Sequence, residues 1–222
     1  MFLLLTASLA LGAPPADDWK AQEAVHLRNI KAITVDFVRA GEGYFSPDGK
    51  KIIFQAEEKD TGNPFYQIFV MDLESGRYRR ISPGLGRTTC PFFSPDGKRV
   101  IFRSDRKEKD RLQLYVINAD GTDERALTDN DKWVYWAPFW YKDAQHIIYT
   151  AADHSDPTAR PNYDLYWMNI EKRKSTRLTY APGADVLPVF NPQGTKAMWT
   201  SSNRDGNPSS QLYIADFMPP KE

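Results

Sequence analysis

Cysteine is almost absent from this sequence of 222 residues, and neither sign of charge is in excess. The single cysteine, Cys90, excludes an intramolecular disulfide, so the fold must be stabilised by its core and by the joining of its ends. The 29 lysines and arginines equal the 29 aspartates and glutamates. Because this balance gives no long-range attraction to nucleic acid or anionic lipid, we predict no nucleic-acid partner.

Residues and motifs of common catalytic chemistries are also scarce. Only three histidines occur, His26, His146 and His154, and no pair of them has the spacing of metal ligands. The sequence contains neither a Gly-x-Ser-x-Gly nucleophile elbow nor a glycine-rich phosphate loop. Cys90 precedes Pro91 and is expected to be a buried, inert thiol. The sequence therefore predicts no catalytic constellation, no metal and no cofactor.

Long hydrophobic runs are missing as well, apart from the start of the chain. Residues 1–13 are uncharged and contain two apolar stretches, Phe2–Leu5 and Leu9–Leu11, that are too short to span a bilayer. Small residues at Ala10 and Gly12 fit a signal-peptidase site, so residues 1–13 are predicted to be a signal peptide, although a basic n-region is missing. The alternative is a buried N-terminal strand or helix. We expect a periplasmic or secreted protein whose mature chain has no integral membrane segment.

The sequence does contain a repeat, in four copies with a period of about 40–50 residues. Each copy opens with aromatic-Ser-Pro-Asp-Gly-Lys or a remnant of it, at Tyr44–Lys50, Phe92–Lys98, Phe139–Asp143 and Val189–Gly194. A second run follows at Ile52–Phe54, Val100–Phe102, Ile147–Tyr149 and Ala197–Trp199, and a third at Ile68–Met71, Leu114–Ile117, Leu165–Met168 and Leu212–Ala215. A fourth run closes the first three copies, at Arg79–Ser82, Arg125–Thr128 and Thr176–Thr179.

Four short strands per repeat at this period are typical of a β-propeller blade. We predict an all-β propeller of four four-stranded blades over residues 28–218, with a tail at residues 219–222. The last copy has no outer strand, whereas Lys31–Thr34 looks like an outer strand with no blade before it. We therefore expect the start of the chain to complete the last blade, which would remove two open sheet edges. Residues 14–27 have room for only one short helix, around Trp19–Leu27.

These motifs resemble a known family. Phe-Ser-Pro-Asp-Gly-Lys, the Val-Ile-Phe and Leu-Tyr-Val strands, Asp-Gly and a closing Arg-x-Leu-Thr are similar to the TolB-type propeller repeat, over about residues 28–217. The resemblance implies the propeller fold and little about function, because the repeat is structural. The TolB propeller has six blades and an N-terminal α/β domain, and TolB is the periplasmic partner of the Tol–Pal system. Four repeats and a short N-terminal segment make a shortened TolB-like propeller the expectation here, without the Tol–Pal partnership.

Loops usually carry the function of such a fold, and we predict a partner-binding surface on one loop face. This face gathers the connections between second and third strands and the connections between blades. Its longest loop, Asp153–Tyr163, offers Asp153, His154, Asp156 and Arg160 as candidate contacts. The alternative for this segment is a solvated loop with local Asx turns.

Aromatic residues and two arginines complete the candidate surface. Trp133, Tyr135 and Trp136 suit stacking against a sugar or a peptide, although alternate members could instead fill the seam between blades. Arg106 and Arg204 follow second strands of their repeats. They are candidates to hold an anion at a channel mouth, and the alternative is that they form structural ion pairs.

Two functional classes remain open. The first is a non-catalytic scaffold of the bacterial cell envelope, linked to envelope transport, that binds a protein or peptide at the loop face. The second is an exported carbohydrate- or peptide-processing propeller whose loops bind the substrate. A convergent acid–base pair would distinguish the second class, and the sequence offers none beyond Asp153, His154 and Asp156.

Export gives a direct test. The mature chain should begin near Ala13 or Pro14, because signal peptidase cleaves after small residues such as those that precede this point. N-terminal sequencing of protein recovered from the periplasm or the medium measures the cleavage site. An intact Met1 on protein recovered from the cytoplasm would contradict both the signal peptide and the envelope localisation.

Overall fold

The computed structural model of the chain describes residues 18–202, 206 and 209–221. The chain divides into an N-terminal unit, Met1–Ile33, and a second unit, Thr34–Glu222. The first unit contains the short helix expected there, α1 (Asp18–Glu23). The predicted signal peptide, residues 1–13, lies outside the described residues. No helix in the described part of the chain is long and apolar enough to cross a membrane.

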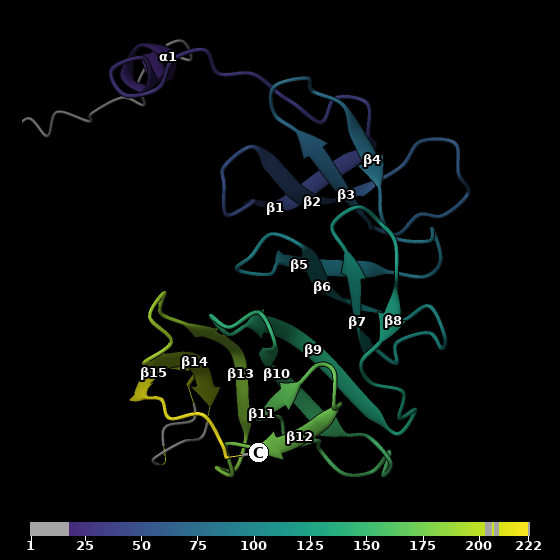
Figure 1. Cartoon of the computed structure of the whole chain (residues 1–222), viewed down its shortest axis with the longest axis vertical. Coiled ribbons are helices and arrows are strands. Elements are labelled where there is room, and N and C mark those ends of the chain that lie inside the picture. Colours follow the sequence, from purple (N-terminus) through teal and green to yellow (C-terminus); the bar gives the residue numbers. More distant parts are fainter. Residues whose placement is uncertain (1–17, 203–205, 207–208, 222) are drawn as a thin grey trace, which may run out of the picture. The chain divides into compact units, whose positions relative to one another are not determined.

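The second unit consists of four antiparallel sheets that follow one another in chain order (Figure 1). The first holds β1 (Arg39–Phe45), β2 (Lys51–Glu57), β3 (Gln67–Asp72) and β4 (Tyr78–Arg80). The second holds β5 (Thr88–Phe93), β6 (Arg99–Ser104), β7 (Gln113–Asn118) and β8 (Arg125–Ala126). The third holds β9 (Trp133–Trp140), β10 (His146–Asp153), β11 (Asp164–Asn169) and β12 (Lys174–Arg177). The fourth holds β13 (Ala184–Phe190), β14 (Lys196–Ser202) and β15 (Gln211–Asp216).

The Ser-Pro-Asp-Gly motif forms the turn between the first two strands of a sheet. In the first sheet the Ser46 hydroxyl donates to the Asp48 carboxylate at 2.6 Å and accepts from the Lys51 amide at 2.9 Å. Gly49 takes the positive φ, 69°, that closes the turn. The third repeat has lost the motif, and Ala144 adopts the positive φ there while Asp143 accepts the Gln145 and His146 amides. The strand count is unchanged by this loss.

The core lies in the seams between successive sheets, because alternate residues of a strand point to opposite faces. Within β6, Val100 and Phe102 pack against the first sheet, whereas Ile101 packs against the third. Both faces of the second and third sheets are thus buried, which explains why their strands are continuous apolar runs.

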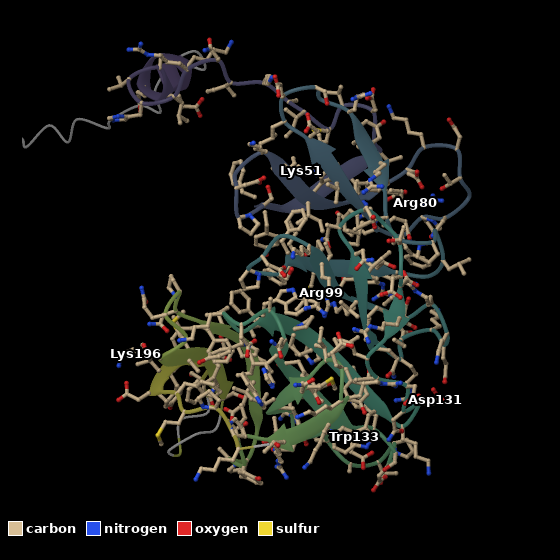
Figure 2. The ribbon with its side chains drawn as sticks, in the orientation of Figure 1. Lys51, Arg80, Arg99, Asp131, Trp133 and Lys196 are labelled. Atoms are coloured by element: carbon tan, nitrogen blue, oxygen red, sulfur yellow. The ribbon has the colours of Figure 1, made fainter. Side chains whose placement is uncertain are left out.

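Ion pairs join the second and third sheets at the edge of their seam. Glu171 accepts from Arg125 at 2.7 Å and from Arg99, which is labelled in Figure 2, at 3.0 Å. The Arg125 hydrogen bond lowers the pKa of the Glu171 carboxyl. Because all three side chains remain partly exposed, these pairs orient the sheets more than they stabilise them.

The first strand of each sheet, here called the inner strand, also carries a β-bulge that the repeat pattern did not reveal. The register shifts in β1, β5, β9 and β13, and in each shift one non-glycine residue has a positive φ. These residues are Glu42, Cys90, Ala137 and Leu187. Cys90 is half-buried, less enclosed than predicted, and burial raises the pKa of its thiol to about 11. The bulges bend the inner strands at one position in every repeat.

The all-β propeller fold is confirmed, but the predicted completion of the last blade by Lys31–Thr34 is wrong for the described residues. The last sheet has three strands, and β15 pairs there with β14. Lys31–Thr34 is not a strand, and the amide of Phe37 donates to the Thr34 carbonyl in a turn. Phe37 then packs against Phe54 and Phe69 of the first sheet. The chain therefore enters the first blade at this point and does not pair with the last one.

Two leucines test whether the seams carry the stability. Leu114 is fully buried between the second and third sheets, so Leu114→Ala should lower the free energy of unfolding by about 2–5 kcal/mol. Leu212 is 71% exposed on β15, and Leu212→Ala should change it by less than about 1 kcal/mol. Urea denaturation of both variants measures the difference. Equal losses would show that the seams are not the main stabilising contacts.

Candidate functional site

A cavity of about 680 Å³ opens at the seam between the second and third sheets. Its walls come from the connection between β8 and β9 and from all four strands of the third sheet. Leu127, Ala151 and Met168 form apolar parts of the wall, and Thr128, Asn130 and Ser175 add polar groups. Trp133, labelled in Figure 2, lies at this cavity and was one of the residues predicted from sequence.

Four aromatic rings in the cavity wall form a closed circuit of contacts. The ring centres of Trp133 and Tyr135 are 6.2 Å apart, and those of Tyr135 and Tyr149 are 6.1 Å apart. Tyr149 stacks on Tyr166 at 5.7 Å, and Tyr166 meets Trp133 edge-on at 6.0 Å. We call these four side chains the aromatic enclosure.

Strand pairing explains why the four rings meet. Tyr149 and Tyr166 face each other directly across β10 and β11. Tyr135 lies opposite Ala151, two residues further along β10, so it projects from the same face of the sheet as Tyr149. The hydroxyl of the buried Tyr149 is held by the Ser175 hydroxyl at 2.8 Å. The enclosure is therefore built on rigid strands and not on a loop.

The enclosure presents uncharged phenols at neutral pH. Burial, with smaller contributions from Asp129, Tyr166 and Asp153, raises the pKa of Tyr135 to about 12. Burial raises the pKa of Tyr149 and of Tyr166 as well.

Charges of both signs lie at the rim, with one carboxylate and two cations in the cavity wall. Arg173 lies 3.5 Å from the Asp129 carboxylate and also donates to the Leu127 carbonyl at 3.3 Å. Lys172 is an exposed second cation of the wall.

The predicted loop supplies no side chain to the cavity wall. Asp153 accepts the Ser155 amide, Asp156 accepts the amide and hydroxyl of Thr158, and these bonds lower the pKa of both carboxyls. Such Asx turns are the alternative that the sequence left open for this segment. Arg160 is exposed in the same loop.

His154 and Trp136 meet at a different residue, Tyr163. The His154 ring nitrogen Nε2 lies 2.9 Å from the Tyr163 hydroxyl, and burial and Arg111 lower the pKa of this histidine. Trp136 meets the Tyr163 ring edge-on at 5.9 Å, with the Arg103 guanidinium 5.7 Å from its own ring. The structure thus separates Trp136 from Trp133 and Tyr135, because successive residues of β9 point to opposite faces.

Arg106 lies in the seam between the first and second sheets. Its guanidinium is 4.2 Å from the Tyr115 ring centre and 5.4 Å from that of Phe102, and it forms an ion pair with Glu124. Only 8% of the side chain is exposed, so Arg106 sits in the structural ion pair that was the alternative to an anion site. Arg204, the other arginine of that prediction, lies outside the described residues.

Sequence reasoning missed Tyr149 and Tyr166, half of the enclosure. Both occupy positions of the repeat that hold core residues in other blades, so they were assigned to strands and not to a site. A comparison of the repeats could have found them. Asp153 of the third repeat stands where the second repeat has Arg106, so the arginine that covers the equivalent rings is missing there. No cluster of three or more possible metal-binding side chains occurs among the residues that the structure describes.

Comparison with known proteins identifies what the chain is similar to. Its sequence matches the family model described as the TolB beta propeller domain over residues 23–160. The structure is similar to the putative TolB from Agrobacterium tumefaciens, with TM-score 0.57 and 21% identity, over 82% of this chain and 61% of that chain. TolB from Acinetobacter baumannii gives TM-score 0.60 and 20% identity, over 80% and 41% of the two chains.

An enzyme shares the fold to a similar degree. An oligogalacturonate lyase, solved in complex with manganese, gives TM-score 0.63 and 19% identity over 84% of this chain and 52% of the lyase. Identities at this level establish the fold alone. The chain also spans less than two thirds of the length of each of these three proteins.

The raised pKa of Tyr135 predicts a loss of stability at alkaline pH. Below pH of about 10 the tyrosine is protonated in both folded and unfolded chains, and its full contribution is present. Between about pH 10 and 12 the unfolded chain loses the proton first, so the free energy of unfolding falls. Tyr135→Phe should reduce this fall, and its free energy of unfolding should not vary between pH 7 and 9 as a result of this position. Denaturant titrations at each pH measure the free energy of unfolding. The same fall between pH 10 and 12 in both proteins would contradict the raised pKa of Tyr135.

Proposed function

Because this chain belongs to the TolB beta propeller domain family, we propose that it is a non-catalytic binding protein of the bacterial cell envelope that captures a peptide segment of a partner protein. The aromatic enclosure is the observation that carries this proposal. Tryptophan and tyrosine dominate the binding energy of protein interfaces, and here four such rings line one cavity.

The size and lining of the cavity suit a peptide side chain and its flanking backbone. A volume of about 680 Å³ lies within the range of typical ligand sites, about 300–1,000 Å³. The aromatic wall offers apolar contact, and the exposed Asn130 and Ser175 offer hydrogen bonds to a backbone. Rigid strands hold the rings in place, so little conformational entropy is lost when a partner binds.

A binding role is favoured over catalysis by what the nearby ionisable groups do. The carboxylates of Asp153 and Asp156 cap local turns, and the imidazole of His154 contacts the Tyr163 phenol. A general acid and a general base must converge on one reacting atom. These three groups instead hold their own loop in shape.

The envelope location and a role in envelope transport form part of the same proposal. They are supported by the apolar start of the chain, with its small residues at Ala10 and Gly12, and by the match to the TolB beta propeller domain.

A second function is an exported propeller that processes a carbohydrate or a peptide. The stacked rings of Trp133 and Tyr135 are also a platform for a sugar ring, and an oligogalacturonate lyase shares the fold. Under this alternative the purified chain should convert oligogalacturonate to unsaturated products, which ultraviolet absorbance detects. No conversion, together with saturable peptide binding, favours the first function.

Two tryptophans of β9 provide a matched test of peptide binding. Peptides selected from a displayed random library against the immobilised chain should bind Trp133→Ala more weakly by about 1–3 kcal/mol, since the ring lines the cavity. Trp136→Ala removes the same side chain from outside the cavity wall and should keep the affinity. Calorimetry measures the affinities, and circular dichroism confirms that both variants fold. Peptides that bind Trp133→Ala as tightly as the unaltered chain would refute the proposed function.

A further inference from the structure

The aromatic enclosure has an internal counterpart in the seam between the first and second sheets. There Phe102 and Tyr115 face each other across β6 and β7 and stack at 5.7 Å. Tyr149 and Tyr166 face each other in the same way across β10 and β11 and stack at the same ring distance, 5.7 Å. The two ring pairs occupy equivalent positions of successive repeats.

At the first seam the ring pair is covered by a cation from the same chain. The Arg106 guanidinium lies over both rings, donates to the Ser104 hydroxyl at 3.1 Å and pairs with Glu124. The Arg106 side chain is almost completely buried there. Gly86 has a positive φ, and a Cβ atom added there would lie 2.7 Å from the Arg106 Cα, so the backbone at Gly86 passes close to the backbone of Arg106.

At the second seam every one of these groups has been replaced. Strand register places Asp153 where the first seam has Arg106, and Ser175 where it has Glu124. Ala151 stands at the position of Ser104. No described side chain equivalent to Arg106 or Glu124 covers the stacked rings at the second seam, and the cavity of about 680 Å³ lies against these rings.

Two aromatic side chains replace small ones around this space. The register of the inner strands places Tyr135 at the position of Thr88 and Trp133 at that of Gly86. The exchange adds two rings to the two that were already stacked. A site that holds a guanidinium at the first seam thus becomes, at the second, an open site with twice as many rings.

We propose that the aromatic enclosure binds the guanidinium group of an arginine side chain from the peptide partner, in the place that Arg106 fills at the first seam. This inference rests on the proposed peptide-binding function and names the side chain that is recognised. A planar guanidinium stacks on aromatic faces, and the negative faces of tyrosine and tryptophan rings attract a cation.

Fixed charges of both signs surround the enclosure. Asp153 lies on the same face of β10 as Tyr149, and Asp129 lies in the cavity wall. Arg173 and Lys172 oppose a cation, but the Arg173 charge is compensated by Asp129 and by the Leu127 carbonyl. Lys132 lies close enough to Asp153 to lower the pKa of its carboxyl. These two carboxylates and three cations leave a net charge of +1 that opposes a cationic guest, so the rings must provide the preference for a cation.

Capped tripeptides of the form acetyl-Gly-X-Gly-amide test the inference on the intact chain. The peptide with arginine at X should bind at least about tenfold more tightly than the peptide with citrulline, which has the same shape without the charge. Lysine at X should give an intermediate affinity, because its ammonium group cannot stack. Chemical-shift titration at millimolar peptide concentration measures all three. Equal affinities for arginine and citrulline would overturn the inference.

A self-filling variant provides a second test. Asp153→Arg combined with Ser175→Glu restores the arginine and carboxylate of the first seam, so it should abolish arginine-peptide binding. Asp156→Arg combined with Ser155→Glu makes the same charge change on the loop outside the cavity wall and should keep binding. Arginine-peptide binding that survives the first pair unchanged would overturn the inference.

A third pair of variants covers the case in which the self-filling chain does not fold. Tyr166→Phe keeps the ring and should keep arginine binding, whereas Tyr166→Leu removes the ring and should weaken that binding about tenfold. Equal affinities of the two would overturn the inference. The proposed function fails by a separate result, which is that library-selected peptides of any sequence bind Trp133→Ala unchanged.

Discussion

The stability and the candidate site of this propeller both depend on the packing of one sheet against the next. A strand in the middle of the series has two buried faces, so neighbouring residues such as Ile101 and Phe102 belong to different seams. A substitution in one repeat therefore acts on one seam and leaves the next one intact. This separation lets a closely packed seam, filled by Arg106, lie beside a seam that contains a cavity.

The packing between sheets also explains why the cavity could form without a large loss of stability. Leu114, Val116 and Leu127 still meet Ile147 and Met168 at the second seam, so the apolar contact between the sheets persists beside the open space. Glu171 joins Arg99 and Arg125 across its edge. The seam is thus held at several points, and Trp133 and Tyr135 could replace small residues without separating the sheets.

Much of the fold could be predicted from the sequence, because the apolar runs and turn residues recur at matching positions in each repeat and so indicate the strands and turns. The bulges at Cys90 and Ala137 could not, since nothing in their local sequence demands a positive φ. Lys31–Thr34 was assigned to the last blade by its Ile-Thr ending, yet the burial of Phe37 against Phe54 directs the chain into the first blade. The burial of a large apolar side chain, three residues beyond the Ile-Thr match, decided which blade the chain enters.

The candidate site was half predictable for a related reason. Trp133 and Tyr135 stood out because they lie near a blade-to-blade connection, whereas Tyr149 and Tyr166 looked like ordinary core residues. Alternation along β9 already separates Trp136 from the other two rings, and this inference was available before the structure. The loop Asp153–Tyr163 attracted attention through its charges, but its carboxylates serve its own turns.

The buried Arg106 also indicates how strongly a visiting side chain can be held. Arg106 is tethered to its site, so it occupies the rings without the loss of translational freedom that a free partner suffers. A separate chain that offers a single arginine would be captured weakly and released quickly. Lasting attachment would then require several such residues on one partner or several copies of this propeller on one surface, so that rebinding outpaces escape.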